Sequence, residues 1–397
     1  MKRVIAVFAS FFCMVAMGGC GGGSSRTSGS NNGNSNGGNP SLAAGSELLY
    51  VGDNAGTIHG FGVDPNSGAL TALPPVVVTN GAAAGDLGLA ADPGGMVLYA
   101  TSAGVGGPNV GSFIVNKTSG GLSTAGNLSL SVPPRKVATV GPIYVIPDPS
   151  ANSAEMFAVG VNGNTGAITQ GPTIALPAAP HDLTIVPFGN NLPSWIGVTF
   201  DGNSGGEIEG IMLQPNGSAA GTQLGATSTG GSSPQGIRAT PDARFVFVAN
   251  QGTNTVSAFS LNSSTGALAA VPGSPFATGS APGPVAIYPP PVAVTSTSCC
   301  PSGKFVLVGN TGDNSLSVYS IDSTGSLTPV TGTPVSLGSN AQPQSIAVDP
   351  SGKFVYVSIA PQEVAGFALD QGTGALTPIT GSPFSIGAVT RDMVFVP

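Results

Sequence analysis

Two arginines and a histidine are the side chains of this sequence best suited to bind an anion or to move a proton. Such groups are scarce, since only 7% of the 397 residues are charged and two are histidines. Arg135, His181 and Arg391 are each followed by one charged residue and then by a short apolar run. A guanidinium binds a carboxylate through two hydrogen bonds, and an imidazole can act as acid or base near neutral pH. Together they can hold a carboxylate or an opening lactone, and we name them as the candidate catalytic residues.

The same two positions recur before other apolar runs of the chain. Aligned on these runs, the first position holds Leu87, Arg135, His181, Gln235, Gly283, Gln344 and Arg391. The second position holds Gly88, Lys136, Asp182, Gly236, Pro284, Ser345 and Asp392. The further members that we expect to bind a ligand are Gln235, Gln344, Asp182 and Lys136. The alternative is that these positions are polar only because solvent lines them.

These positions belong to a repeat that predicts the fold. A strand-and-turn phrase such as GFGVDPNSGAL (60–70) or GFALDQGTGAL (366–376) occurs seven times, at intervals of about 50 residues. The glycines that mark its turn are Gly68, Gly120, Gly166, Gly217, Gly266, Gly325 and Gly374. Each repeat divides into short β-branched and aromatic segments, most clearly 304–308, 315–321, 327–330 and 343–348.

Seven units of four strands predict an all-β, seven-bladed β-propeller over residues 47–397. The first repeat begins with an outer-type strand at 47–51. The chain ends at 392–396 on the other strand type, which the first repeat lacks at its start. We therefore expect the last strand to complete the first blade in a 3+1 closure, which protects the sheet edges. The alternatives are an open solenoid or paired β-sandwiches.

The repeat resembles a known family. The segments 349–357 (DPSGKFVYV) and 373–384 (TGALTPITGSPF) look like the YVTN-type repeats of the seven-bladed lactonase-like propellers, over nearly all of residues 47–397. That family includes 6-phosphogluconolactonase-type and muconate-lactonising proteins, and Pro180-His181-Asp182 is similar to its Pro-His segments. The family's enzymes use a fuller set of His, Arg and Glu. No glutamate falls in the two aligned positions here, which weighs against an enzyme.

The N-terminus predicts export. Lys2 and Arg3 precede an apolar stretch at 4–17, which is typical of a signal peptide over residues 1–19. The segment Met17-Gly18-Gly19-Cys20 resembles a bacterial lipobox, which implies lipidation of Cys20; the alternative is ordinary secretion. Residues 20–46 are rich in Gly, Ser and Asn and predict a flexible linker. By analogy with bacterial lipoproteins, Gly21 rather than Asp after the cysteine favours the outer membrane of a cell with two membranes, on its periplasmic or surface face.

Composition and cysteines narrow the partners. The net charge of −7 argues against nucleic-acid binding, and 61 glycines and 35 prolines argue against a helical protein. Cys299 and Cys300 are adjacent and predict either a vicinal disulfide or two thiols. No motif predicts a metal or a cofactor. We expect a monomer that is attached to the membrane by its lipid.

These features favour an exported, lipid-anchored propeller that binds an envelope protein or a small anionic ligand such as a sugar acid. The first alternative is a lactonase-type hydrolase that uses His181, Arg135 and Arg391. The second is a structural surface protein. Because fold alone does not specify function, the geometry of the charged residues has to decide between them.

Overall fold

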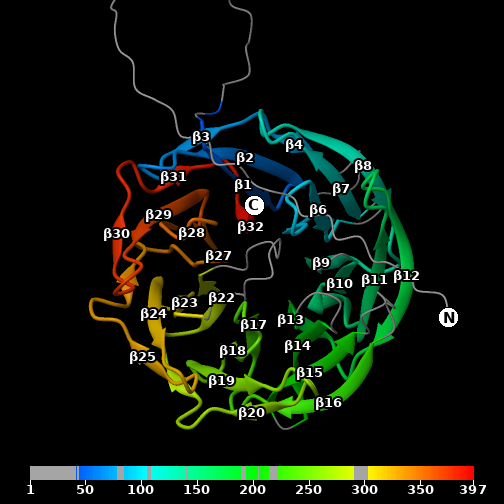
Figure 1. Cartoon of the computed structure of the whole chain (residues 1–397), viewed down its shortest axis with the longest axis vertical. Helices are drawn as coiled ribbons and strands as arrows, with labels where there is room; N and C mark the ends of the chain where they lie inside the picture. The colour runs from blue at the N-terminus through cyan, green and yellow to red at the C-terminus, as the bar shows by residue number, and fades with distance from the viewer. Residues whose placement is uncertain are drawn as a thin grey trace, which may run out of the picture. The chain divides into compact units, whose positions relative to one another are not determined.

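The fold is a ring of seven antiparallel β-sheets around a common central axis, which we term the channel axis, as the repeats predict (Figure 1). The computed structural model describes residues 42, 44–77, 85–104, 109–139, 142–188, 194–203, 205–213, 221–289 and 303–397. The signal peptide, Cys20, most of the linker, Gly217, Cys299 and Cys300 lie outside the described residues. No helix in the described ranges is long and apolar enough to cross a membrane.

Each blade has four strands ordered from the channel outward. The innermost strands are β32 (Thr390–Val396), β5 (Leu87–Ala91), β9 (Pro134–Thr139), β13 (Pro180–Pro187), β17 (Pro234–Ala239), β22 (Pro282–Tyr288) and β27 (Ser345–Val348). The second strands are β1 (Glu47–Asp53), β6 (Val97–Ser102), β10 (Ile143–Pro147), β14 (Ser194–Gly202), β18 (Phe245–Asn250), β23 (Phe305–Asn310) and β28 (Phe354–Ile359). The third strands are β2 (Thr57–Val63), β7 (Val110–Val115), β11 (Glu155–Val161), β15 (Gly205–Leu213), β19 (Thr255–Leu261), β24 (Ser315–Ile321) and β29 (Glu363–Leu369).

The outermost strands are β3 (Leu70–Ala72), β8 (Leu122–Leu128), β12 (Ile168–Ala175), β16 (Thr222–Ser228), β20 (Leu268–Ala270), β25 (Leu327–Pro329) and β30 (Leu376–Pro378). Four blades add a two-residue piece that pairs with the third strand, which the sequence patterns did not predict. These pieces are β4 (Val76–Val77), β21 (Phe276–Ala277), β26 (Val335–Ser336) and β31 (Phe384–Ser385). The one other regular element in the described ranges is a short 3-10 helix at Pro149–Ala151.

The ring closes through the two ends of the propeller, which confirms the 3+1 closure. Strand β32 pairs antiparallel with β1 from Leu48↔Val396 to Gly52↔Asp392. In Figure 1 the red C-terminal strand accordingly lies beside the blue first strands. The inner strands also contact one another in sequence around the channel, from β32 to β5 and on to β27.

The core consists of seven apolar layers between adjacent blades. Leu48 and Tyr50 of β1 pack toward the blade of β5–β8, whereas Leu49 and Val51 pack toward the blade of β27–β31. Successive side chains of a strand point to opposite faces, so a strand between two blades must be apolar on both. This explains why the second strands have continuous apolar runs.

The turn glycines of the repeat lie in these same seams. Gly68 has φ +71°, which a side chain rarely adopts, and an added Cβ would approach within 2.7 Å of Phe354 Cδ1 in the neighbouring blade. The hydroxyl of Tyr356 donates a hydrogen bond of 2.6 Å to the Gly68 carbonyl. The glycine is therefore required both by its turn and by the close approach of the next blade.

Candidate functional site

The first aligned position lies where the inner strands begin, on the face of the ring that we term the mouth face. In five blades the residue at this position falls in an irregularity of the β-ladder, between two paired residues of the inner strand. These residues are Arg135, His181, Gln235, Gly283 and Arg391. A β-bulge turns a side chain out of the regular alternation. The pairing thus places them at equivalent points around the channel.

One small cavity on the mouth face gathers four of the predicted residues. It has a volume of about 50 Å³ and is lined by Asp86, Leu87, Arg135, Lys136, Gln344 and Arg391. We call it the mouth pocket. A cavity of this size has room for a few waters or one carboxylate group, and it is far smaller than a typical ligand pocket of roughly 300–1,000 Å³. It can therefore hold the charged end of a ligand while the remainder stays outside.

Two of its cations are paired with aspartates. Arg391 Nε donates to Asp86 Oδ1 at 2.9 Å, and both side chains are about one-third exposed (33% and 36%). Lys136 Nζ donates to Asp392 Oδ2 at 3.2 Å. The alignment of the repeats did not select Asp86. This residue directly precedes Leu87, where several other repeats have a proline.

Arg135 differs from every other basic residue that the structure describes. Its side chain is half-buried and has no hydrogen bond or ion pair within the described ranges. The seven other described basic side chains each have a partner; they are Lys117, Lys136, Arg238, Arg244, Lys304, Lys353 and Arg391. An arginine without a protein partner in a pocket is a position where an anion from outside can be bound.

The backbone fixes Arg135 close to the neighbouring blade. Its carbonyl accepts a hydrogen bond of 3.1 Å from Thr101 Oγ1. The same carbonyl oxygen lies 2.1 Å from the place where Gly88 would carry a Cβ. Any side chain at Gly88 would push β5 and β9 apart, so the glycine allows the approach that forms this side of the mouth pocket.

His181 lies on the next blade and is not among the residues that line the mouth pocket. Its Nε2 is 3.2 Å from Asp201 Oδ2 at the end of β14. The imidazole is mostly buried and the aspartate is mostly exposed (17% and 54%). The other histidine, His59, makes a similar pair with Asp53 at 3.0 Å. Burial of the Asp53 carboxyl acts to raise its pKa, but hydrogen bonds from His59, Thr57 and Ala55 outweigh burial, so the pKa is lowered.

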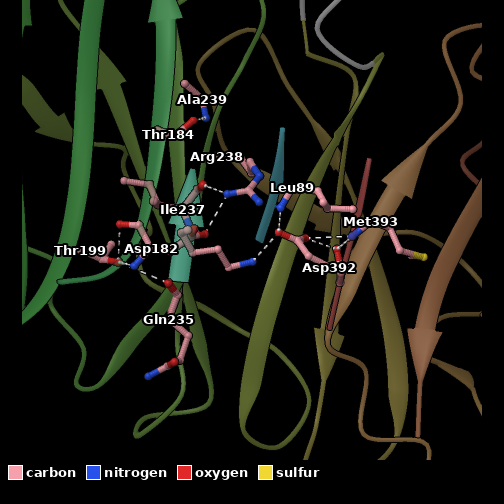
Figure 2. A network of polar contacts seen from close by, with 12 residues as sticks. Leu89, Asp182, Thr184, Thr199, Gln235, Ile237, Arg238, Ala239, Asp392 and Met393 are labelled. Atoms are coloured by element: carbon pink, nitrogen blue, oxygen red, sulfur yellow. Dashed lines mark hydrogen bonds and ion pairs between the residues drawn. The ribbon is translucent and has the colours of Figure 1, made fainter. Parts of the chain in front are cut away.

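Asp182 and Gln235 take part in a connection between two blades (Figure 2). Asp182 Oδ2 accepts from the Ile237 amide at 3.2 Å and from Arg238 Nη1 at 2.8 Å. Thr199 Oγ1 bridges the carbonyls of Asp182 and Gln235. The Asp182 carboxylate is thus buried and occupied by the protein itself. Arg238, which the sequence reasoning did not select, is its partner.

Asp392 makes the corresponding connection at the closure of the ring (Figure 2). Its carboxylate accepts from the Leu89 amide at 3.1 Å, Ser345 Oγ at 2.9 Å and the Met393 amide at 3.0 Å, besides Lys136. These donors come from four different blades. The carboxylate therefore holds Lys136 at the mouth pocket and ties the C-terminal strand to its neighbours.

Three further described cations serve the seams of the opposite face. Arg244 donates to the Ser323 carbonyl at 2.9 Å and Lys353 to the Pro65 carbonyl at 3.4 Å, while Lys304 donates to the Gln371 carbonyl. Each reaches the turn of the next blade around the ring. In the described ranges no group of three or more His, Cys, Asp or Glu side chains could hold a metal ion.

Comparison with known proteins supports this fold. The family model described as "Lactonase, 7-bladed beta-propeller" matches residues 216–287 and 296–391. A search of the curated proteins finds no match to this chain.

Two solved structures show how far the likeness extends. A protein of Bacteroides fragilis, described as a candidate 6-phosphogluconolactonase, has a TM-score of 0.72 at 19% identity, covering 90% of this chain and 100% of that one. The periplasmic gluconolactonase of Pseudomonas aeruginosa has a TM-score of 0.66 at 18% identity, covering 89% and 99%. At such identities the likeness establishes the fold alone.

Proposed function

We propose that this chain is an exported, lipid-anchored member of the lactonase-type propellers that binds a small organic carboxylate, such as a sugar acid, at the mouth pocket. The observation that carries the proposal is Arg135, which alone among the described basic residues has no side-chain partner within the part of the chain that the structure describes. It lines one cavity together with Lys136 and Arg391. Gln344 adds an amide that can donate to a second oxygen of the ligand.

Calorimetric titration with D-gluconate tests the binding site. A hydrogen bond to a charged group contributes about 1.5–3 kcal/mol, so Arg135→Ala is expected to weaken binding about 10- to 100-fold. Arg244→Ala is the matched control, since it removes the same side chain from the opposite face. An equal loss in both variants, or no loss in Arg135→Ala, would contradict the proposal.

Hydrolysis of a sugar lactone is the second candidate function. It is supported by the match to the lactonase family model and by the His181–Asp201 pair, which lies on the blade next to that of Arg135. A histidine oriented by a carboxylate can take the proton of an attacking water. The hydroxide adds to the lactone carbonyl carbon, the ring C–O bond breaks, and the histidine returns the proton to the departing ring oxygen. The new acid group loses its own proton to solvent, and Arg135 would bind the resulting carboxylate.

A panel of lactones, corrected for spontaneous hydrolysis, separates the two functions. His181→Ala is expected to abolish turnover, whereas His59→Ala, which removes the other histidine of a His–Asp pair, is expected to retain it. If the wild type shows no turnover that depends on His181, hydrolysis is excluded and ligand binding remains to be judged by the titration.

Location in the envelope depends on Cys20. A lipid on this residue anchors a protein stably when several acyl chains are present, because each buried CH₂ contributes roughly 0.8 kcal/mol. Cys20→Ser is expected to move the protein from the membrane to the soluble fraction of the expressing cell. Retention in the membrane fraction would contradict lipid anchoring.

A further inference from the structure

We infer that the mouth pocket selects ligands with a single negative charge and that Asp86 rejects a second one. This inference rests on the proposed function, because it concerns the charge of the ligand bound at Arg135. The reason is that Lys136 and Arg391 are already neutralised by aspartates of the protein, whereas Arg135 is not.

Asp86 places a carboxylate in the lining of the mouth pocket. It forms an ion pair of 2.9 Å with Arg391, yet 36% of its side chain is exposed and it lines the same cavity as Arg135. A ligand in the pocket therefore meets the carboxylate of Asp86 as well as the guanidinium of Arg391. Such a pair offers little net attraction to an anion, and it repels a charge placed close to the carboxylate.

Lys136 is already paired with a carboxylate of the protein. Its partner Asp392 is nearly buried, with 10% of its side chain exposed, and that carboxylate also accepts hydrogen bonds from Leu89, Ser345 and Met393. Moving Lys136 toward a ligand would leave a buried carboxylate without its cation, which is costly. Lys136 is therefore held in place and its charge is already balanced.

The count of charges then gives the ligand class. The three cations of the pocket, Arg135, Lys136 and Arg391, face two carboxylates, those of Asp86 and Asp392. One positive charge remains, on Arg135. A monocarboxylate balances it. A dicarboxylate or a phosphorylated sugar acid brings a further charge for which the pocket has no uncommitted cation, and Asp86 opposes it.

The test compares acetate with malonate, which differs by a second carboxylate one carbon away from the first, so that both charges stay close to Asp86. Titration of the wild type is expected to show tighter binding of acetate by about tenfold. Asp86→Asn frees Arg391 and is expected to bring the two affinities within about threefold, mainly through tighter binding of malonate. Asp370→Asn is the matched control. It removes one charge from an exposed turn on the opposite face, where other repeats have Asn116, Asn162 and Asn262 in the same role.

Each outcome decides one of the two proposals. Equal binding of the two ligands by the wild type, or an unchanged ratio in Asp86→Asn, overturns the selection by charge but leaves carboxylate binding intact. Failure of the wild type to bind D-gluconate, acetate or malonate overturns the proposed binding function itself. Competition of acetate and of malonate with bound D-gluconate in the wild type gives the same ranking without any substitution, so the answer does not depend on the folding of the variant.

Discussion

Glu47 is expected to make the propeller less stable as the pH rises toward neutrality. It begins β1, the strand that closes the ring, and its Oε2 is buried without a hydrogen-bond partner in the described ranges. Burial, followed by the nearby charge of Asp349, raises the pKa of Glu47 from 4.5 to about 7. The folded protein therefore keeps a proton on this carboxyl at a pH where the unfolded chain has lost it.

The size of the effect follows from linkage. Each pKa unit corresponds to about 1.36 kcal/mol, so the full shift is worth about 3 kcal/mol. Glu47 is only partly buried, and screening by solvent reduces this to about 1–2 kcal/mol. The stabilisation is complete below pH 4.5, decreases as the pH rises from 4.5 to 7, and is absent above pH 7.

Urea unfolding between pH 4.5 and 8 measures this dependence. Glu47→Gln keeps the shape of the side chain without the charge and is expected to lose the decline between pH 4.5 and 7. At pH 8 it should be more stable than the wild type by about 1–2 kcal/mol. Glu363→Gln, at the first residue of β29, controls for the loss of a negative charge. An unaltered pH slope in Glu47→Gln would refute the reasoning.

Three further outcomes test the contacts that the inner strands make with their neighbours. Asp392→Asn leaves Lys136 with a weaker partner and is expected to lower the free energy of unfolding by about 2–3 kcal/mol in urea titrations. Gly88→Ala is expected to destabilise by about 1–3 kcal/mol, since its Cβ would meet a carbonyl oxygen, whereas Gly163→Ala, with no atom within 4 Å, should be neutral. Truncation that removes β32 takes the inner strand from one blade. It is expected to abolish cooperative unfolding, which circular dichroism during a urea titration would measure.

The fold could be predicted from the sequence because its determinants recur. A turn glycine such as Gly68 or Gly374 marks each repeat of the sequence. The apolar runs between these glycines are continuous, because each strand packs against two neighbouring blades. Seven copies of one pattern predict seven blades. The number of strands per blade follows from the four short segments of each repeat, and the manner of closure follows from the first and last runs.

The site was predicted only in part, because its contacts join residues that are remote in sequence. Arg391 and Asp86 are 305 positions apart, and Leu89 and Asp392 are 303 apart. The alignment of repeats finds the position at which a side chain enters the channel, but it does not show which neighbour satisfies that side chain. Asp182 illustrates this, because the sequence presents it as a ligand-binding residue and the structure shows its carboxylate bound by Arg238.

The scarcity of charge in this chain gives an unpaired cation its significance. On a surface rich in lysine and arginine, one arginine without a partner would be ordinary, since exposed cations are commonly solvated. Here Arg244, Lys304 and Lys353 hold a turn of the next blade, Lys117 holds the carbonyl of Pro397, and the others neutralise an aspartate at the channel, as Lys136 does. Arg135 does neither, although it is half-buried among them. If the basic residues served only to assemble the ring, Arg135 would have no role. Its substitution therefore separates assembly from recognition: Arg135→Ala should leave the stability of the propeller nearly unchanged while it weakens carboxylate binding.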